Sequence, residues 1–536
     1  MPRPSTAEAE IAEELAVVRP ALLPAYTDAL PGARAAVLTR LWRGLTHDPL
    51  PWVTGREDTR SGVVLRLADG RRLEGPASDP YATDARVTAV RLDGTEYDDP
   101  APLMTDLAVP HADSFAAELG HSAASLALSR AGQQDFGGPG DAAPERDWEW
   151  EQRVVDGHPF HPNCRSRPGF SVAEQLAYGP EHRPVVELRL VPVPAAECLV
   201  SGVWPDGLRD GDRLLVPVHP WQAAHVLKRA GDGSAPGGGE GAAWADGEGA
   251  ARADGEGAAS VRGVGVLAAH PLMALRTLAL PDGPHVKTAV SARLTSSVRD
   301  ISLGSVAASA VLSDFGQTVA ERTDGLLRIT RTPAAVAAGS PDLTALLRES
   351  PEAYAGPGER VVPVAALAAT GLPRSPARLA RLARLALTVG LRLLDLGVAL
   401  EAHGQNLLVV LSPDGEPVRL VYRDLADLRV SPARLARHGI SVPEVPDRMV
   451  TDDALALRRK LFGSLVAGAL AGTAGSGTAL RAALEKAVPD LPRTDGLSAL
   501  RDGPLPAKAL TLMRLSPGAT GDQWAELPNP LRFGTR

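Results

Sequence analysis

Hydrophobic residues recur at helical spacing most clearly between residues 376 and 400. Leu379, Leu382, Leu385 and Leu391 repeat every three to six positions there, with arginine and aspartate between them. This pattern is that of an amphipathic helix with one buried face. This is the strongest helical pattern in the chain, and we expect a helix at 376–400.

Three other segments have helical patterns, and they flank the middle of the chain: residues 6–46, 113–131 and 453–515. In the first, Pro20, Pro24 and Pro31 interrupt the pattern. A proline inside a helix removes a backbone donor and clashes with the preceding turn. We therefore expect these prolines to break the run.

Alternating or short apolar runs bounded by turn residues predict strands. They occur as a hairpin at 61–75, as strands at Val185–Val191 and Arg213–Val218, and throughout 262–332. A second hairpin joins Asn406–Leu411 to Pro417–Val421. Strands and helices do not alternate regularly, so the expected class is α+β.

The length of 536 residues exceeds that of one ordinary core and predicts several packed parts. We expect a helical and β-stranded N-terminal region at 1–150, a β-rich region at 151–335, and a region at 336–536 that holds the long helix, the second hairpin and a helical tail. Residues 231–260 contain an eight-residue repeat rich in Gly, Ala, Asp and Glu. This composition predicts a flexible surface insertion.

Charge and composition exclude several classes of protein. The net charge is −8, with 56 basic and 64 acidic side chains, which disfavours binding to nucleic acid or to an anionic membrane. The chain starts without the basic and apolar pattern of a signal peptide, and its most apolar long stretch carries several charges. Only Cys164 and Cys198 are present, as expected for a reduced, cytoplasmic protein.

The first cluster of polar side chains surrounds two His-Pro pairs. His158 and His161 precede Pro159 and Pro162, so proline stiffens the loop that presents both imidazoles, and Arg165 follows. Such side chains bond phosphate or carboxylate oxygens. A Pro-rich surface turn explains the local features equally well. A zinc site would need a third ligand that the sequence does not show.

The second cluster is basic and lies in the strand-rich middle of the chain. It comprises Arg276, Thr277, Lys287, Thr295 and Arg299. Several cations are needed together to neutralise a polyphosphate. A solvated strand face is the alternative for these side chains.

The third and fourth clusters flank the second hairpin. Glu401, His403, Gln405 and Asn406 follow the long helix, and Asp424 ends the second strand. Asn and Asp oxygens suit Mg²⁺, which takes its other ligands from water and phosphate. Asp424 alone could equally be a cap or an ion-pair partner. The chain has no Walker-type phosphate loop.

Four motifs together identify a family resemblance. They are Gly157-His-Pro-Phe-His-Pro with Gly169-Phe170, His219-Pro-Trp-Gln, Lys287 with Leu294-Thr-Ser and Arg299, and Glu401-Ala-His-Gly-Gln-Asn with Tyr422-Arg-Asp. In this order the motifs resemble the IucA/IucC family, the NRPS-independent siderophore synthetases. The resemblance implies a hand-like fold with fingers, palm and thumb, a mixed or antiparallel β palm, and helical N- and C-terminal parts.

The resemblance also implies a reaction and its participants. ATP and Mg²⁺ would bind in the palm, a carboxylate of citrate or a citrate derivative would be adenylated, and an amine or hydroxyl would displace AMP. Such members act on small molecules and are often dimers, so a homodimer is expected.

The resemblance assigns roles to the clustered residues. ATP would contact His158, His161, Arg165, Arg276, Thr277, Lys287, Gln405 and Asn406. The substrate carboxylate would contact Thr295, Arg299 and His403, and catalysis would depend on Arg299, His403 and Lys287. Magnesium would be held by Asp424 with Glu401 or Asn406.

The chain departs from the family pattern at two places. Arg165 stands where the family usually has lysine, and Ala274 stands where a hydroxyl is expected. A nucleotide- or siderophore-binding homologue without catalysis is therefore an alternative, as is a kinase-like phosphotransferase that would release ADP. A ferric reductase with a cysteine-ligated cluster is disfavoured because the two cysteines lie 34 residues apart.

Overall fold

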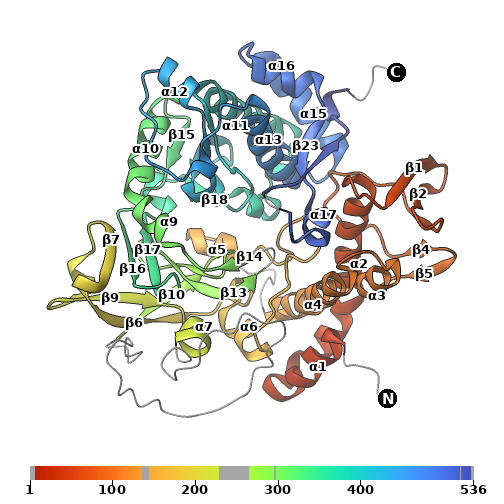
Figure 1. The fold of residues 1–536 in the computed structure, drawn as a ribbon, viewed down its shortest axis with the longest axis horizontal. Helices are drawn as coiled ribbons and strands as arrows, with labels where there is room; N and C mark the ends of the chain where they lie inside the picture. The colour runs from red at the N-terminus through yellow and green to blue at the C-terminus, as the bar shows by residue number, and fades with distance from the viewer. Residues whose placement is uncertain (1–5, 136–143, 228–264, 295–296, 520, 533–536) are drawn as a thin grey trace.

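The computed structural model describes residues 6–135, 144–227, 265–294, 297–519 and 521–532. Helices and largely antiparallel sheets form it, which confirms the α+β class (Figure 1). The repeat at 231–260 and Thr295 lie outside the described residues. Among the helices in these ranges, none is long and apolar enough to cross a membrane.

The N-terminal part packs four helices beside a small sheet. The helices are α1 (Ala7–Val18), α2 (Leu23–His47), α3 (Pro100–Leu107) and α4 (Ala112–Ala131). The sheet has the order β1-β2-β3-β4-β5, with bounds Val53–Thr59, Gly62–Leu67, Arg72–Gly75, Val90–Leu92 and Thr95–Tyr97. The hairpin predicted at 61–75 and the helix predicted at 113–131 are confirmed.

The prediction that three prolines break the first helix is partly wrong. Pro20 begins a short 3₁₀ turn and Pro24 lies in the first turn of α2, where proline costs no hydrogen bond. Pro31, however, lies inside α2, and the helix continues to His47. Burial of most of the following residues of α2 in the core outweighs the lost backbone bond.

A nine-stranded antiparallel sheet forms the middle of the molecule, in the order β7-β16-β17-β12-β11-β10-β6-β9-β8. Its strands are β6 (Val186–Pro194), β7 (Cys198–Gly202), β8 (Arg209–Asp210), β9 (Arg213–Val218), β10 (Gly265–Pro271), β11 (Thr277–Ala279), β12 (His285–Thr288), β16 (Ala334–Ala338) and β17 (Thr344–Arg348). Within 262–332 the chain also forms α9 (Leu303–Ala307) and α10 (Ser309–Glu321), which the strand prediction missed.

Register in this sheet gathers polar side chains on one face. Thr277 pairs with Lys287, Lys287 with Leu346, and His285 with Arg348. Paired residues, and residues two apart on one strand, point to the same side of a sheet. Thr277, Lys287 and Arg348 therefore share one face.

The third part is organised around α11 (Pro376–Leu396), the helix that the leucine pattern predicts. Ser375 caps its start by accepting the amide N–H of Arg378, and Gly397 ends it with a left-handed φ of 91°. The sheet beside it has the order β15-β21-β20-β18, with bounds Leu327–Ile329, Pro417–Tyr422, Leu407–Leu411 and Arg360–Pro363. The pairing of β20 with β21 confirms the second predicted hairpin.

The C-terminal region contains α13 (Ala454–Ser464), α15 (Gly477–Ala487), α16 (Asp495–Asp502) and α17 (Leu510–Leu515). It also contains β23 (Leu505–Lys508) and β24 (Trp524–Leu527), so the prediction of helix throughout 453–515 is wrong at β23. The buried carboxylate of Asp48 accepts the amide N–H groups of Thr511 and Leu512 at 2.9 and 3.1 Å. This contact joins α17 to the end of α2.

Three large hydrophobic cores correspond to these parts. One draws on α1–α4 and α17, one on the inner face of the nine-stranded sheet, and one on α10, α11, α13 and α15. The divisions near residues 150 and 335 stay predictions.

Candidate active site

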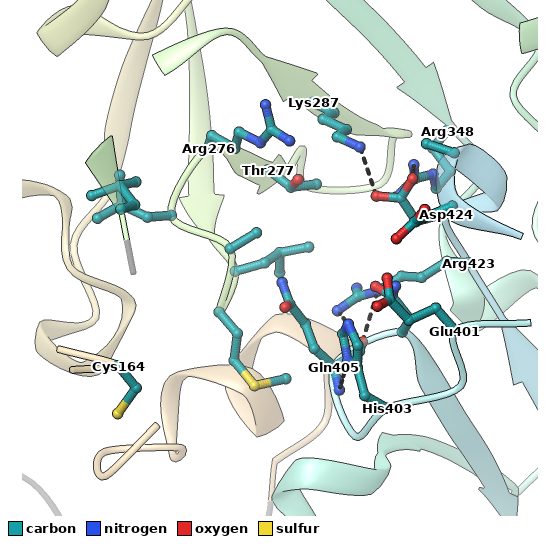
Figure 2. Close-up of a pocket in the computed structure, with 18 of the residues that line it drawn as sticks. Cys164, Arg276, Thr277, Lys287, Arg348, Glu401, His403, Gln405, Arg423 and Asp424 are labelled. Atoms are coloured by element: carbon teal, nitrogen blue, oxygen red, sulfur yellow. Dashed lines mark hydrogen bonds and ion pairs between the residues drawn. The ribbon is translucent and has the colours of Figure 1, made fainter. Parts of the chain in front are cut away.

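A cavity of about 300 Å³ lies between the nine-stranded sheet and the loops that flank the β20–β21 hairpin (Figure 2). Its wall includes nine of the predicted site residues: Arg165, Arg276, Thr277, Lys287, Glu401, His403, Gln405, Asn406 and Asp424. These positions span 260 residues of sequence, from 165 to 424. The fold therefore brings the separate polar clusters to one place.

Asp424 forms the centre of a charged cluster on the sheet side of this cavity. Its carboxylate lies 2.6 Å from the Lys287 Nζ and 3.4 Å from the Arg348 Nη2, as Figure 2 shows. Burial would raise the pKa of Asp424, but Lys287 and Arg348 hold it well below its usual range. The carboxylate is thus ionised between two cations.

Burial lowers the pKa of Lys287 to about 8. Asp424 opposes this effect, but the positive charges of Arg276 and Arg348 add to it. The lysine is held among cations that an incoming polyanion would neutralise.

Asp424 also has an unusual backbone conformation, with φ 77° and ψ 80°. A non-glycine residue with positive φ is uncommon, and such strain is found disproportionately at functional sites. The Tyr422 hydroxyl donates to the carbonyl of Asp424 at 3.2 Å, and Tyr422 is completely buried. Packing of Tyr422 therefore helps to hold the turn that presents the carboxylate.

The loop after α11 presents Glu401 and His403. Glu401 lies 2.7 Å from the Lys508 Nζ and 3.2 Å from the Lys460 Nζ. Burial would raise the pKa of Glu401, but Lys508, His403 and Lys460 lower it to about 2. The charge of Glu401 is therefore balanced by lysines from α13 and β23.

Burial lowers the pKa of His403, so the ring is neutral near pH 7. Its Nδ1 accepts the amide N–H of Gln405 at 3.2 Å. A neutral imidazole that accepts at Nδ1 carries its proton on Nε2. His403 can therefore donate a hydrogen bond from Nε2 and is not a base in this form.

The His-Pro loop contributes to the site unevenly. Neither His158 nor His161 lines the cavity; His158 is exposed, His161 is buried, and their rings meet edge to face at 6.1 Å. Arg165 lines the cavity, but its guanidinium donates to Glu181 at 3.1 Å and to the Val154 carbonyl at 2.6 Å. These bonds favour a supporting role for Arg165, whereas nucleotide contact by these three residues stays a prediction.

Arg299 ends β14 (Ser297–Arg299), where it pairs with Val290 of β13 (Val290–Leu294). The structure does not describe its side chain, so its predicted role is open. Ala274 does line the cavity, at the position where a hydroxyl was expected.

Sequence reasoning missed Arg348, Glu151 and Lys460. Arg348 lies on the same sheet face as Lys287, and its position at the end of the apolar strand β17 was the available sign. Glu151 is buried in α5 (Asp147–Gln152), where it accepts the amide N–H of Met273 at 2.9 Å. Lys460 lies 2.8 Å from Asp427, which also lines the cavity.

The cavity wall fits a magnesium ion that arrives with a nucleotide. Asp424, Asp427, Glu401 and Asn406 supply oxygen atoms there. Across the described residues, no group of three His, Cys, Asp or Glu side chains could hold an ion alone. Mg²⁺ commonly takes one or two carboxylates and completes its shell with phosphate and water.

Two family models match parts of the chain. The IucA / IucC family model matches residues 147–232 and 257–369. A second model, that of the ferric iron reductase FhuF-like transporter, matches residues 379–521. The two matches together include all 21 residues that line the cavity.

Two curated relatives resemble parts of the chain. The citryl-spermidine/3,4-dihydroxybenzoyl-citryl-spermidine:spermidine ligase of Bacillus anthracis is 25% identical over 327 residues, which are 52% of this chain and 50% of the relative. The 2-[(L-alanin-3-ylcarbamoyl)methyl]-3-(2-aminoethylcarbamoyl)-2-hydroxypropanoate synthase of Staphylococcus aureus is 27% identical over 112 residues, 16% of this chain and 18% of the relative. The chain thus matches half or less of the length of these relatives.

Solved structures share the fold along nearly the whole chain. The petrobactin biosynthesis protein AsbB from Bacillus anthracis has a TM-score of 0.71 at 18% identity and covers 95% of this chain and 98% of its own. The ATP-bound aerobactin synthetase IucA from Klebsiella pneumoniae has a TM-score of 0.69 at 19% identity, covering 93% and 99%. In its motifs, in the family match over 147–232 and 257–369 and in this shared fold, the chain is similar to the IucA/IucC family of NRPS-independent siderophore synthetases.

Proposed function

We propose that this protein is an ATP-dependent ligase of siderophore biosynthesis. It adenylates a carboxylate of citrate or a citrate derivative and joins it to an amine or hydroxyl, in the cytoplasm and as a homodimer. The observation that carries the proposal is the convergence of Arg276, Lys287 and Arg348 with the loop from Glu401 to Asn406 around one cavity. The match to the IucA / IucC family model and the ATP-bound state of the similar aerobactin synthetase support it.

Charge complementarity suits this cavity to two anionic substrates. Three cations surround a single carboxylate at Asp424, so the cluster has a net positive charge. ATP brings a polyphosphate, and citrate brings carboxylates, which repel one another in water. The cations offset that repulsion and allow the reacting groups to approach.

In the first step, a carboxylate oxygen of the acid attacks the α-phosphorus of ATP. A P–O bond forms, the bond to the β-phosphate oxygen breaks, and pyrophosphate leaves with the electron pair. Arg276 and Lys287 neutralise the phosphate oxygens, with Thr277 as a hydroxyl donor. Magnesium, held by Asp424 with Asn406 or Glu401, would supply further charge neutralisation at the phosphates.

In the second step, the nitrogen or oxygen of the acceptor attacks the acyl carbon. A new C–N or C–O bond forms, the acyl C–O bond to the phosphate breaks, and AMP leaves with that electron pair. Neutral His403 supports both steps by donating from Nε2 to an oxygen that gains negative charge. The proton of the nucleophile passes to water.

Two alternatives make different predictions. A kinase-like phosphotransferase would release ADP instead of AMP. A binding protein without catalysis, the alternative suggested by Ala274, would bind nucleotide without any turnover. The FhuF-like match does not favour a cysteine-ligated iron–sulfur reductase, because residues 379–521 contain no cysteine.

The test is ATP–pyrophosphate exchange with a panel of di- and tricarboxylates, followed by product analysis with amines and alcohols. We expect citrate or a citrate monoamide to stimulate exchange, and AMP to appear only when an acceptor is added. ADP as the product would support the kinase alternative. Nucleotide binding without exchange for any acid would support the non-catalytic one.

A further inference from the structure

A second cavity, of about 210 Å³, adjoins the first across the charged cluster. The two cavities share five lining residues: Arg276, Lys287, Arg348, Asp424 and Ala426. The far wall of the second cavity is made by the start of α10 and by the loop and short helix α9 before it. In Figure 1, α9 and α10 lie against β16, and the strand next to β16 in the same sheet, β17, carries Arg348.

The wall of this second cavity differs chemically from that of the first. Thirteen of its 20 lining residues carry a hydroxyl or an apolar side chain: Ser302, Ser305, Ser309, Ser313, Thr332, Ile301, Ala308, Leu312, Leu346, Leu425, Ala426, Pro446 and Met449. Ser309 has an exposed fraction of only 6%. Among the described residues, its Oγ has no hydrogen-bond partner. An unpaired buried hydroxyl costs free energy, and in this conformation protein atoms cover the Ser309 Oγ.

The charged groups that line the cavity are positive in excess. Arg276, Lys287, Arg348 and Arg448 contribute four positive charges, while Asp300 and Asp424 contribute two negative ones. Both Asp424 oxygens already lie near cations of the cluster. A polycation would therefore meet net repulsion, whereas a carboxylate would be attracted.

We propose that this second cavity, the acceptor chamber, binds the nucleophile, and that the nucleophile is an amino acid rather than a polyamine. This inference rests on the proposed ligase function. Once pyrophosphate has left, the acceptor's carboxylate is attracted by the cations of the shared wall, and its polar body bonds the serine hydroxyls. Its amine or hydroxyl then reaches the acyl adenylate held in the first cavity from the side of Lys287 and Arg348.

The acceptor class proposed for this chain differs from the one in the name of a relative. The curated Bacillus anthracis protein is named as a ligase for spermidine, a polyamine. The excess positive charge around the acceptor chamber predicts a different acceptor class for this chain. The bond changes are those of the second step above, with the amino acid supplying the attacking atom and water receiving its proton.

The test separates the two half-reactions in variants of α9 and α10. Ser305→Trp fills the acceptor chamber from its wall, and Val311→Trp adds the same bulk on the exposed side of α10 as a matched control. With citrate, ATP and L-2,3-diaminopropionate or L-serine, we expect Ser305→Trp to lower condensation at least about tenfold relative to ATP–pyrophosphate exchange. Val311→Trp should change neither, and thermal unfolding of both variants checks the fold.

Small and cationic acceptors complete the test. Hydroxylamine is small enough to trap the acyl adenylate without the chamber, so Ser305→Trp should retain hydroxamate formation. Spermidine should be a poorer acceptor than either amino acid in the wild type. An equal loss of exchange and condensation in Ser305→Trp would show that the chamber binds the acid, which would overturn the proposal. Unchanged condensation in Ser305→Trp, or a preference of the wild type for spermidine, would overturn it as well. If the wild type shows no exchange with any acid, the ligase function itself fails and the acceptor chamber with it.

Discussion

The Arg423 Nη1 lies 2.7 Å from the Glu151 Oε1, and both side chains are buried, with exposed fractions of 4% and 0%. Each partner also bonds a backbone group on a different side of the active-site cavity. Glu151 accepts the amide N–H of Met273 at 2.9 Å, and Arg423 donates to the carbonyl of Gln405, also at 2.9 Å. This ion pair therefore links α5 to the loop before Arg276 and to the loop after α11.

Glu151→Gln is expected to destabilise the protein strongly. The substitution keeps the shape of the side chain but removes the carboxylate that pairs directly with buried Arg423, and breaking comparable buried pairs costs about 3–5 kcal/mol. Urea unfolding measures the loss. Glu57→Gln is a matched control, because its ion pair with Arg66 is exposed and should be worth at most about 1 kcal/mol. Equal small losses in both variants would show that Arg423 finds another partner.

Lys287→Ala is expected to lower turnover by about 10²-fold or more without unfolding the protein. The reason is the loss of one of the cations that would neutralise the phosphates, at a position where only 9% of the side chain is exposed. The rate of ATP–pyrophosphate exchange measures the effect, and circular dichroism checks the fold. Arg72→Ala, at an exposed position of β3, controls for removal of a positive charge. Wild-type exchange in Lys287→Ala would remove the proposed cation cluster from the mechanism.

The pKa of Lys287, lowered to about 8, predicts an alkaline limit to activity. Below this pH the lysine is charged and can bind phosphate; above it the lysine becomes neutral and loses that attraction. The kcat/KM for ATP should therefore fall as pH rises through about 8, since this ratio reports the free enzyme. Lys287→Arg keeps its charge at all these pH values, so its alkaline limb should move to higher pH. An identical limb in both proteins would assign the limit to another group.

Local sequence patterns predict the elements whose ends are set by neighbouring cap or turn residues. The leucine repeat with Ser375 and Gly397 defines α11, and the turn between β20 and β21 defines that hairpin. The path of α2 through Pro31 could not be predicted, because tertiary burial outweighs a local penalty there. The strand β23, within a segment that has a helical pattern, depends in the same way on pairing with β24, which lies outside that segment.

The site shows a similar division between motif residues and supporting residues. Lys287, His403 and Asp424 stand in motifs and were predictable as a group, whereas Arg348 joins them only through the register of β12 and β17. Long-range pairing of this kind leaves little trace in a single sequence. Lys460 is equally hidden: it belongs to α13, and its 2% exposure is explained only by the carboxylates that surround it.

The lysines around Glu401 provide a test of positioning at a distance from the reacting atoms. Lys508 is partly exposed and lies 2.7 Å from Glu401 and 3.0 Å from Asp522, so its removal should spare the core. In Lys508→Met, Glu401 keeps only Lys460 as a lysine partner, so the pKa of Glu401 should rise from about 2. The loop that carries His403 should also become more mobile. We expect kcat/KM for ATP to fall about tenfold.

The pH profile distinguishes positioning from a loss of stability in this variant. A carboxyl group whose pKa is held low stays ionised until the pH falls towards that pKa, so raising the pKa of Glu401 should move the acid limb of activity to higher pH. Lys508→Arg should restore both the rate and the limb, because arginine supplies the charge from a similar distance. Lys486→Met, on the exposed surface of α15, should match the wild type. A tenfold fall in rate with an unshifted acid limb would show that Lys508 acts on the site by some route other than the charge of Glu401.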